Sequence, residues 1–207
     1  MAGLPVDHIV YAARDLPAAV EDLAAQLGVR AAPGGQHVGR GTRNFLLSLG
    51  DGPYLEVIGP DPDQPEPPAA RPFGVDTLAA DHLVGFAVKC ADIPGAVARS
   101  RAGGYDPGDE HEMARATPDG ALLEWKLTLG PGFDGLVPFL IDWMATPHPS
   151  ATNPGGATLV GLRGEHPEPA GVRAALDALG VELDVAEGPA PALVATLDTP
   201  RGRVELR

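Results

Sequence analysis

The sequence predicts an α+β fold built from a repeated strand–helix–strand unit. Residues 7–20 form an apolar strand pattern followed by a helix start, and residues 83–97 repeat this order with the same Asp-x-Pro-x-Ala-Val ending. A weaker third copy runs through residues 159–172. Because internal repetition dictates architecture, we expect two paired modules and a third, partial module at the C-terminus.

Composition and charge limit the class of protein. The chain has 207 residues, of which 44% are hydrophobic, so a sizeable core can form. Its formal net charge of −13 argues against nucleic acid and anionic membranes as partners. The single Cys90 excludes an internal disulfide, and neither a signal peptide nor a membrane-spanning stretch is evident. We therefore expect a cytoplasmic protein.

The helix of the first module carries clear start and stop signals. Val20, Leu23 and Leu27 have helical spacing within residues 18–27. The preceding Asp-Leu-Pro supplies an N-cap and a proline for the first turn, and Gly28 supplies the stop.

A hairpin follows this helix. The Asp-Gly pair at 51–52 is a strong turn signal between strands predicted at 44–49 and 54–58, and a further short strand is expected near 29–31. Residues 33–42 are rich in glycine, but no helix follows them, so they make a poor phosphate-binding loop.

The second copy begins near residue 82. Its helix is predicted at 93–102, and strands are predicted at 112–117 and 121–129, on either side of a second Asp-Gly turn. The third copy has a predicted strand at 158–162, a helix at 169–179 and strands at 193–197 and 203–206.

Two segments interrupt the repeat. The first holds six prolines between residues 60 and 72, which indicates a linker or an extended surface loop. The second is apolar and then rich in proline and glycine. We therefore divide the chain into module one (1–60), a Pro-rich connector (61–80), module two (81–130), an irregular aromatic and His-Pro segment (131–156) and the partial third module (157–207).

A repeated glutamate is the strongest candidate for chemistry. Glu56 and Glu124 each lie four residues after the glycine of an Asp-Gly turn, inside an apolar strand. A carboxylate there is costly to bury unless it is paired or binds a metal. If the strands share one sheet, His8 and Glu56 converge on one concavity, where they could hold a divalent metal. Alternatively, each glutamate points to solvent or pairs with an arginine such as Arg43 or Arg115.

Several motifs, in this order, resemble the βαβββ modules of the vicinal oxygen chelate superfamily, which includes glyoxalase I and extradiol dioxygenases. They are Asp-His-Ile-Val (7–10), Leu-Pro-Ala-Ala-Val (16–20), a Gly-rich loop that ends at Asn44 (34–44), Leu-Glu-Val-Ile (55–58), Pro-Phe-Leu-Ile-Asp-Trp (138–143) and His-Pro (148–149). The chain looks like the glyoxalase-like domain subgroup. This resemblance implies that the sheets of the paired modules curl around a cup.

The resemblance also implies a ligand set, which this chain matches only in part. Each module of a metal-using member supplies a ligand from its first strand and a glutamate from its last. Module one matches at His8 and Glu56, and module two matches at Glu124. However, the other module-two position falls on Gly85, which cannot bind a metal. One divalent metal ion would therefore need a further ligand, such as His37 or His148, or no metal is bound.

Two functions follow as expectations. The first is a glyoxalase-like enzyme of the lyase, isomerase or dioxygenase type, with His8 and Glu56 at a metal and Glu124 in catalysis. The second is a protein that binds and sequesters a small molecule without catalysis. The candidate substrate contacts are His37, Asn44, Trp125, Phe139, Trp143 and His148. The expected partner is a small molecule, and a homodimer is compatible with the sequence.

Overall fold

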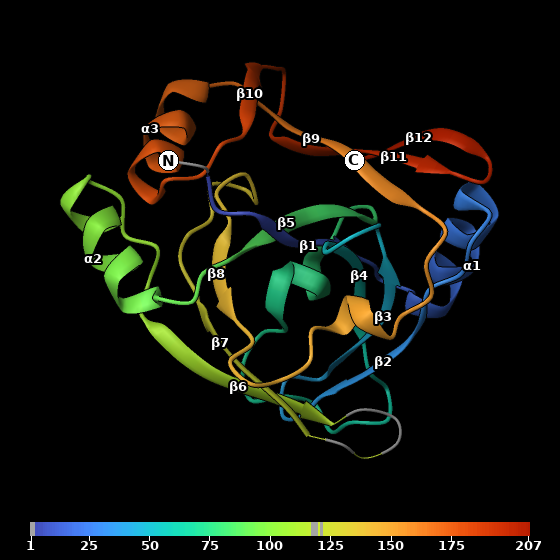
Figure 1. The fold of residues 1–207 in the computed structure, drawn as a ribbon. Coiled ribbons are helices and arrows are strands. Elements are labelled where there is room, and N and C mark those ends of the chain that lie inside the picture. Colours follow the sequence, from blue (N-terminus) through green and yellow to red (C-terminus); the bar gives the residue numbers. More distant parts are fainter. Residues whose placement is uncertain (1–2, 117–119, 121) are drawn as a thin grey trace.

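The computed structural model describes residues 3–116, 120 and 122–207, and its main body is a closed barrel of strands (Figure 1). Module one comprises β1 (Val6–Ala12), α1 (Leu16–Leu27), β2 (Ala32–His37), β3 (Thr42–Ser48) and β4 (Tyr54–Pro60). Module two comprises β5 (His82–Lys89), α2 (Ile93–Ala102), β6 (Glu110–Ala116), β7 (Leu122–Thr128) and β8 (Phe139–Asp142). The third comprises β9 (Thr158–His166), α3 (Pro169–Leu179), β10 (Asp184–Glu187), β11 (Ala192–Thr199) and β12 (Gly202–Leu206).

The strand order confirms the predicted α+β fold of paired modules around a cup. The barrel runs β1-β4-β3-β2-β6-β7-β8-β5, so the first strands of the two modules lie antiparallel to each other. In each module the first strand pairs in parallel with the last strand, β1 with β4 and β5 with β8. The third module forms a separate four-stranded sheet in the order β10-β9-β11-β12.

The repeated Asp-x-Pro motif starts the first two helices as the sequence predicts. The side chain of Asp15 accepts a hydrogen bond from the backbone N–H of Ala18, and that of Asp92 accepts one from Gly95. Gly28 ends α1 in the left-handed region, with φ of 75°. These local signals fix where each helix leaves its strand, and therefore which strand residues precede it.

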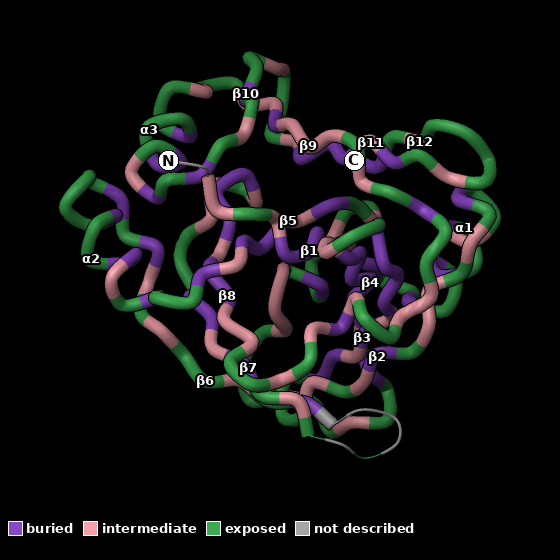
Figure 2. Tube along the Cα trace, in the orientation of Figure 1, coloured by how far each residue is buried: buried purple, intermediate pink, exposed green. Residues whose placement is uncertain are grey.

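The main hydrophobic core lies outside the barrel. Strand residues that point outward, such as Ile9, Leu55 and Val57, pack against the buried face of α1, and the core continues through α2, α3 and the third sheet. Figure 2 shows buried stretches along β1, β3 and β4, and helices at the periphery that carry both buried and exposed stretches. The inward-facing side chains of the barrel are therefore available to line a cavity.

Three strands lie outside the predicted elements. β2 occupies the Gly-rich loop, directly after the short strand expected near 29–31. β8 lies in the segment that was expected to be irregular, and β10 was not anticipated. The Pro-rich segment 61–80 contains the 3₁₀ turn η1 (Pro72–Thr77), whose Val75 is buried against the barrel. A second 3₁₀ turn, η2 (Pro149–Ala151), contacts β3. In the part of the chain that the structure describes, no helix is long and apolar enough to cross a membrane.

Candidate functional site

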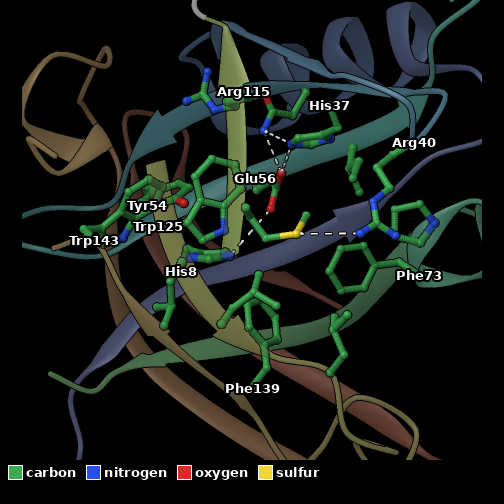
Figure 3. A pocket seen from close by; sticks show the side chains of 17 residues that line it. His8, His37, Arg40, Tyr54, Glu56, Phe73, Arg115, Trp125, Phe139 and Trp143 are labelled. Carbon is green, nitrogen blue, oxygen red and sulfur yellow. Dashed lines mark hydrogen bonds and ion pairs between the residues drawn. The ribbon is translucent and has the colours of Figure 1, made fainter. Parts of the chain in front are cut away.

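The barrel encloses a cavity of about 110 Å³, which we call the main cavity. His8 of β1 and Glu56 of β4 both point into it (Figure 3). Both are buried, and His8 Nε2 lies 3.6 Å from Glu56 Oε2. The structure thus brings together the imidazole and the carboxylate of module one, because β1 and β4 are neighbours in the sheet and Val10 pairs with Glu56.

Asp7 orients the ring of His8. Its carboxylate is fully buried, and Oδ1 lies 2.7 Å from His8 Nδ1. Burial alone would raise the pKa of Asp7, but hydrogen bonds from His148 and His8 outweigh it and hold the pKa well below its usual range. Asp7 is therefore a carboxylate that accepts the Nδ1 proton of His8, and Nε2 of the same ring faces the cavity.

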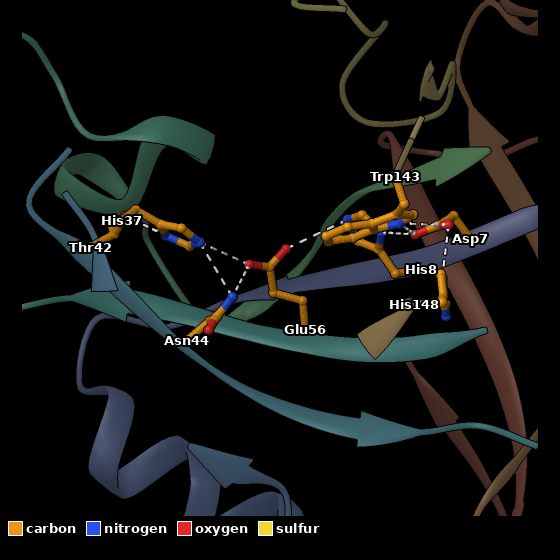
Figure 4. Close-up of polar contacts among 8 residues, drawn as sticks. All are labelled: Asp7, His8, His37, Thr42, Asn44, Glu56, Trp143 and His148. Carbon is orange, nitrogen blue, oxygen red and sulfur yellow. Dashed lines mark hydrogen bonds and ion pairs between the residues drawn. The ribbon is translucent and has the colours of Figure 1, made fainter. Parts of the chain in front are cut away.

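Asp7 also ties the segment after β8 to this site. Trp143 Nε1 donates to Asp7 Oδ2 at 3.1 Å, and His148 Nε2 lies 2.9 Å from the same oxygen. Figure 4 shows the resulting row of polar groups from His37 through Glu56 and His8 to Asp7. One buried carboxylate therefore holds three rings from two distant parts of the chain.

The other side of Glu56 is held by Asn44. The amide nitrogen of Asn44 donates to Glu56 Oε1 at 2.6 Å and lies 3.3 Å from His37 Nε2. His37 Nδ1 lies 3.0 Å from the hydroxyl of Thr42. Burial lowers the pKa of His37, against the attraction of Glu56. A neutral ring fits these contacts, with Nδ1 donating to Thr42 and Nε2 accepting from Asn44.

Charge and aromatic rings complete the polar wall. Tyr54 stacks on His8 with ring centroids 4.7 Å apart, and burial together with Glu56 and Asp7 raises its pKa well above 10. Tyr54 is therefore neutral at physiological pH. Arg115 is buried at the cavity and donates to the carbonyl of Gly34, while Arg40 lines the cavity from an exposed position.

The facing wall is apolar and aromatic. Trp125, Phe139 and Trp143 all line the main cavity, as the sequence led us to expect for ligand contacts. Phe139 meets the His8 ring edge-on, with centroids 5.4 Å apart, and Trp125 lies 5.3 Å from Trp143. His148 does not line the cavity, because its ring lies behind Tyr54 and contacts Asp7 and Ser150.

The expectation that Glu124 faces the cavity is wrong. Glu124 lies on the outer face of β7 and is exposed to solvent, whereas its neighbour Trp125 points inward. The cause is a mismatch of hairpins. The Asp-Gly turn before Glu56 joins the third and fourth strands of module one, whereas the Asp-Gly pair before Glu124 lies between the second and third strands of module two.

Strand pairing identifies the true counterpart of Glu56. In module one, Val10 lies five residues before the helix cap Asp15 and pairs with Glu56. In module two, Ala87 lies five residues before the helix cap Asp92 and pairs with Phe139. Phe139 therefore occupies the module-two position of Glu56. By the same count, Gly85 occupies the position of His8.

The residues present do not fit the four-ligand set that the resemblance implies. The side chains of Gly85 and Phe139 have no atom that can bind a metal. The Phe139 ring packs against His8, where a second carboxylate would stand. The Nε2 lone pair of His37 is engaged by Asn44. Across residues 3–116, 120 and 122–207, no group of three or more His, Cys, Asp or Glu side chains has the geometry to hold a metal ion.

Sequence reasoning missed three residues of this site. Asp7 sits beside His8, but strict strand alternation places it on the opposite face. A register shift between Val6 and His8 in the pairing of β1 with β5 breaks that alternation. Tyr54 shares a face with Glu56, so alternation could have found it. Arg115 was considered only as a partner for a glutamate.

Comparisons with known proteins support this architecture. A family model described as a glyoxalase-like domain matches residues 6–180. A comparison with functionally curated proteins finds no match. A hypothetical protein from Staphylococcus aureus has a similar structure, with a TM-score of 0.64 at 15% identity over 98% of this chain and 84% of that chain.

Two enzymes of known structure are also among the matches. A mutant of 4-hydroxymandelate synthase from Streptomyces coelicolor has a TM-score of 0.50 at 15% identity, over 99% of this chain and 62% of that one. A methylmalonyl-CoA epimerase from the same organism has a TM-score of 0.46 at 21% identity, over 72% and 100%. At such identities the likeness concerns the fold alone. The family model spans most of the chain and confirms the resemblance to the glyoxalase-like domain seen in the sequence, so this protein belongs to the glyoxalase-like domain family.

Proposed function

We propose that this protein is a small-molecule enzyme that moves a proton at a carbon next to a carbonyl group, with His8 and Glu56 as the acid–base pair. The observation that carries the proposal is the buried row Asp7–His8–Glu56, which ends in the main cavity. Such pairing of a carboxylate-backed imidazole with a second carboxylate is an arrangement suited to general acid–base catalysis. The proposed reaction is an isomerisation or lyase step.

Each group has a distinct role in this proposal. The Asp7 carboxylate holds His8 at Nδ1, and His8 in its doubly protonated form donates its Nε2–H to the carbonyl oxygen of the substrate. Glu56 takes the proton from the neighbouring carbon, and the resulting enolate is held by His8. Return of that proton from Glu56 to a different atom of the enolate gives the isomer. Asn44 fixes Glu56 by its hydrogen bond to Oε1, so that Oε2 is the oxygen nearer His8.

Proton exchange in deuterated water tests the proposal directly. We would incubate the protein with a panel of 2-oxo acids and hydroxyketones and follow loss of the C–H signals beside the carbonyl by proton NMR. Wild type should exchange at least one compound, and His8→Gln and Glu56→Gln should each slow this exchange by about 10²–10⁴-fold. Glu124→Gln is the matched control, since that carboxylate lies outside the cavity. Unchanged exchange in both site variants would refute the roles assigned to these groups.

The aromatic wall favours a second candidate, a protein that binds a small molecule without turning it over. In this reading Trp125, Phe139 and Trp143 stack on the ligand, and the polar row only orients it. The two candidates differ in outcome. A compound that raises the melting temperature and shows neither exchange nor turnover would support binding alone.

A further inference from the structure

A second cavity, which we call the side pocket, adjoins the main cavity on the module-two side. It has a volume of about 310 Å³. The two cavities share five lining residues, namely Pro72, Phe73, Leu127, Leu129 and Phe139. The rings of Phe73 and Phe139 lie 6.2 Å apart and stand on the side of the main cavity that is opposite His37 and Arg115 (Figure 3). They therefore form a partition between the two spaces.

The side pocket exists because β8 is short. β8 pairs with β5 only from Ala87 onward, so the preceding part of β5, around Gly85, has no β8 partner. The loop between β7 and β8 passes over this gap, and Gly135 packs against the backbone of β5. Gly85 lines the pocket and carries no side chain to fill it. The pocket thus lies where module one instead has His8.

The lining of the side pocket selects for apolar groups. Among the described residues that line it there is no charged side chain, and Thr128 and Tyr105 are the polar ones. Thr128 is fully buried and its hydroxyl already accepts a hydrogen bond from Leu140. A polar or charged group placed there would lose its hydration without gaining partners.

The volumes of the two cavities favour a ligand that reaches beyond the main cavity. The main cavity of about 110 Å³ is smaller than the roughly 300–1,000 Å³ of common ligand sites. Together with the side pocket it falls within that range. The polar end is also distinctive, because the buried guanidinium of Arg115 and the exposed one of Arg40 both line the main cavity. A carboxylate is a natural partner for either guanidinium group.

We infer that the substrate is an amphipathic acid whose small, carboxylate-bearing head occupies the main cavity and whose apolar tail passes Phe73 and Phe139 into the side pocket. This inference rests on the proposed function for the chemistry at the head. The tail, however, can be tested by binding alone. Phe73 is held in place for this role, since Arg71 bonds the carbonyl of Gly41 and the neighbouring Asp76, while Val75 is buried.

A chain-length series tests the inference. The affinities of straight-chain carboxylates from acetate to decanoate would be measured by calorimetry. Beyond the shortest acids we expect about a fourfold gain per methylene until the side pocket is full. Gly85→Val should leave acetate and propionate binding as in wild type and weaken octanoate by at least about tenfold, because the added side chain occupies the pocket. A flat series, or an unchanged series in this variant, would overturn the inference.

The chain offers a matched control and a milder variant. A Cβ added at Gly85 would meet its nearest neighbour, in Gly135, at 3.7 Å, and one added at Gly161 of β9 would also meet its nearest neighbour at 3.7 Å. Gly161→Val should therefore bind the whole series like wild type. Gly85→Ala gives the same test with a smaller side chain should the valine variant fail to fold, and it should weaken octanoate more than propionate.

Tryptophan fluorescence locates the tail. Trp125 and Trp143 are the chain's only tryptophans, and both line the main cavity but not the side pocket. A bromine quenches an indole that it contacts. Bound 3-bromopropionate should therefore quench strongly, and saturating 8-bromooctanoate should quench less although it binds more tightly. Equal quenching would place the tail in the main cavity and refute the inference. If wild type showed no proton exchange while these binding results came out as expected, the proposed reaction would be refuted and the inference about the tail would stand.

Discussion

Replacing Asp7 by Asn should destabilise the protein by about 2–3 kcal/mol, because hydrogen bonds to charged groups contribute roughly 1.5–3 kcal/mol each and an amide cannot accept all the bonds that Asp7 accepts. The carboxylate takes hydrogen bonds from His8, His148 and Trp143. The Asn side chain keeps the volume but points an N–H at one of these donors. For a chain of this size the loss corresponds to a melting temperature lower by about 4–12 °C at pH 7.

The lowered pKa of Asp7 determines how this loss of stability depends on pH. Because the folded pKa of Asp7 is below its ordinary value of 3.8, the ionised carboxylate stabilises the fold at every pH above that value. This contribution is lost as the pH falls below 3.8 and through the folded pKa. The difference between wild type and Asp7→Asn in urea unfolding should therefore be largest near neutral pH and should shrink below about pH 4.

The matched control is Asp51→Asn, at the exposed Asp-Gly turn between β3 and β4, where Asn-Gly is equally suited to a hairpin. We expect its free energy of unfolding to lie within about 0.5 kcal/mol of wild type. If Asp7→Asn also lay within that margin at pH 7, the carboxylate would not hold the three rings, and the orientation assigned to His8 would fall with it.

Three further outcomes follow from the same contacts. Glu124→Ala should change neither ligand affinity nor the free energy of unfolding by more than about 0.5 kcal/mol, since the side chain is exposed; a loss of binding in calorimetry would contradict its placement. Because the pKa of His37 is lowered from 6.5, its NMR titration should have a midpoint below that value. The free energy of unfolding of wild type should fall as the pH drops below about 6.5, and that of His37→Gln should fall less. Protein purified without a histidine tag should retain less than one metal ion per chain by elemental analysis, because no group of three or more His, Cys, Asp or Glu side chains among the described residues has the geometry to hold a metal ion. One ion per chain that is lost in His8→Ala would refute this.

The fold could be predicted largely because its signals are local. The Asp-x-Pro motif placed the first two helices, and the Asp-Gly turn placed β4. The strand expected near 29–31 lies instead at 32–37, as β2, and this position was missed because the sequence Ala-Pro-Gly-Gly-Gln-His lacks the residues typical of strands. Its Gly34 has a tertiary reason, because an added Cβ would lie 2.3 Å from Asn44 Oδ1. A close approach between two strands cannot be read from one of them alone.

The site was predictable only in its first half. His8 and Glu56 belong to one contiguous module, so strand alternation sufficed to bring them together. Glu124 failed because a matching Asp-Gly-x-x-x-Glu pattern says nothing about which hairpin it closes. The true counterpart, Phe139, became visible once the parallel pairing of β5 with β8 was known. That pairing joins residues 52 positions apart, and no local pattern specifies it.

The asymmetry between the two modules can itself be tested by restoring a donor at Phe139. The Phe139 ring lies 5.4 Å from the ring of His8, which in turn lies beside Glu56. In Phe139→Glu a third donor would therefore stand close to the two present, and a cluster of one imidazole and two carboxylates suits a divalent metal. Without metal this variant should melt below wild type, since it buries a further carboxylate beside Glu56. Added Co²⁺ or Zn²⁺ should then raise its melting temperature. Wild type and Phe73→Glu should not respond, because residue 73 lies on η1 and not on the strand that pairs with β5. A metal response in Phe73→Glu equal to that in Phe139→Glu, or none in Phe139→Glu, would show that strand pairing does not assign position 139 as the counterpart of Glu56.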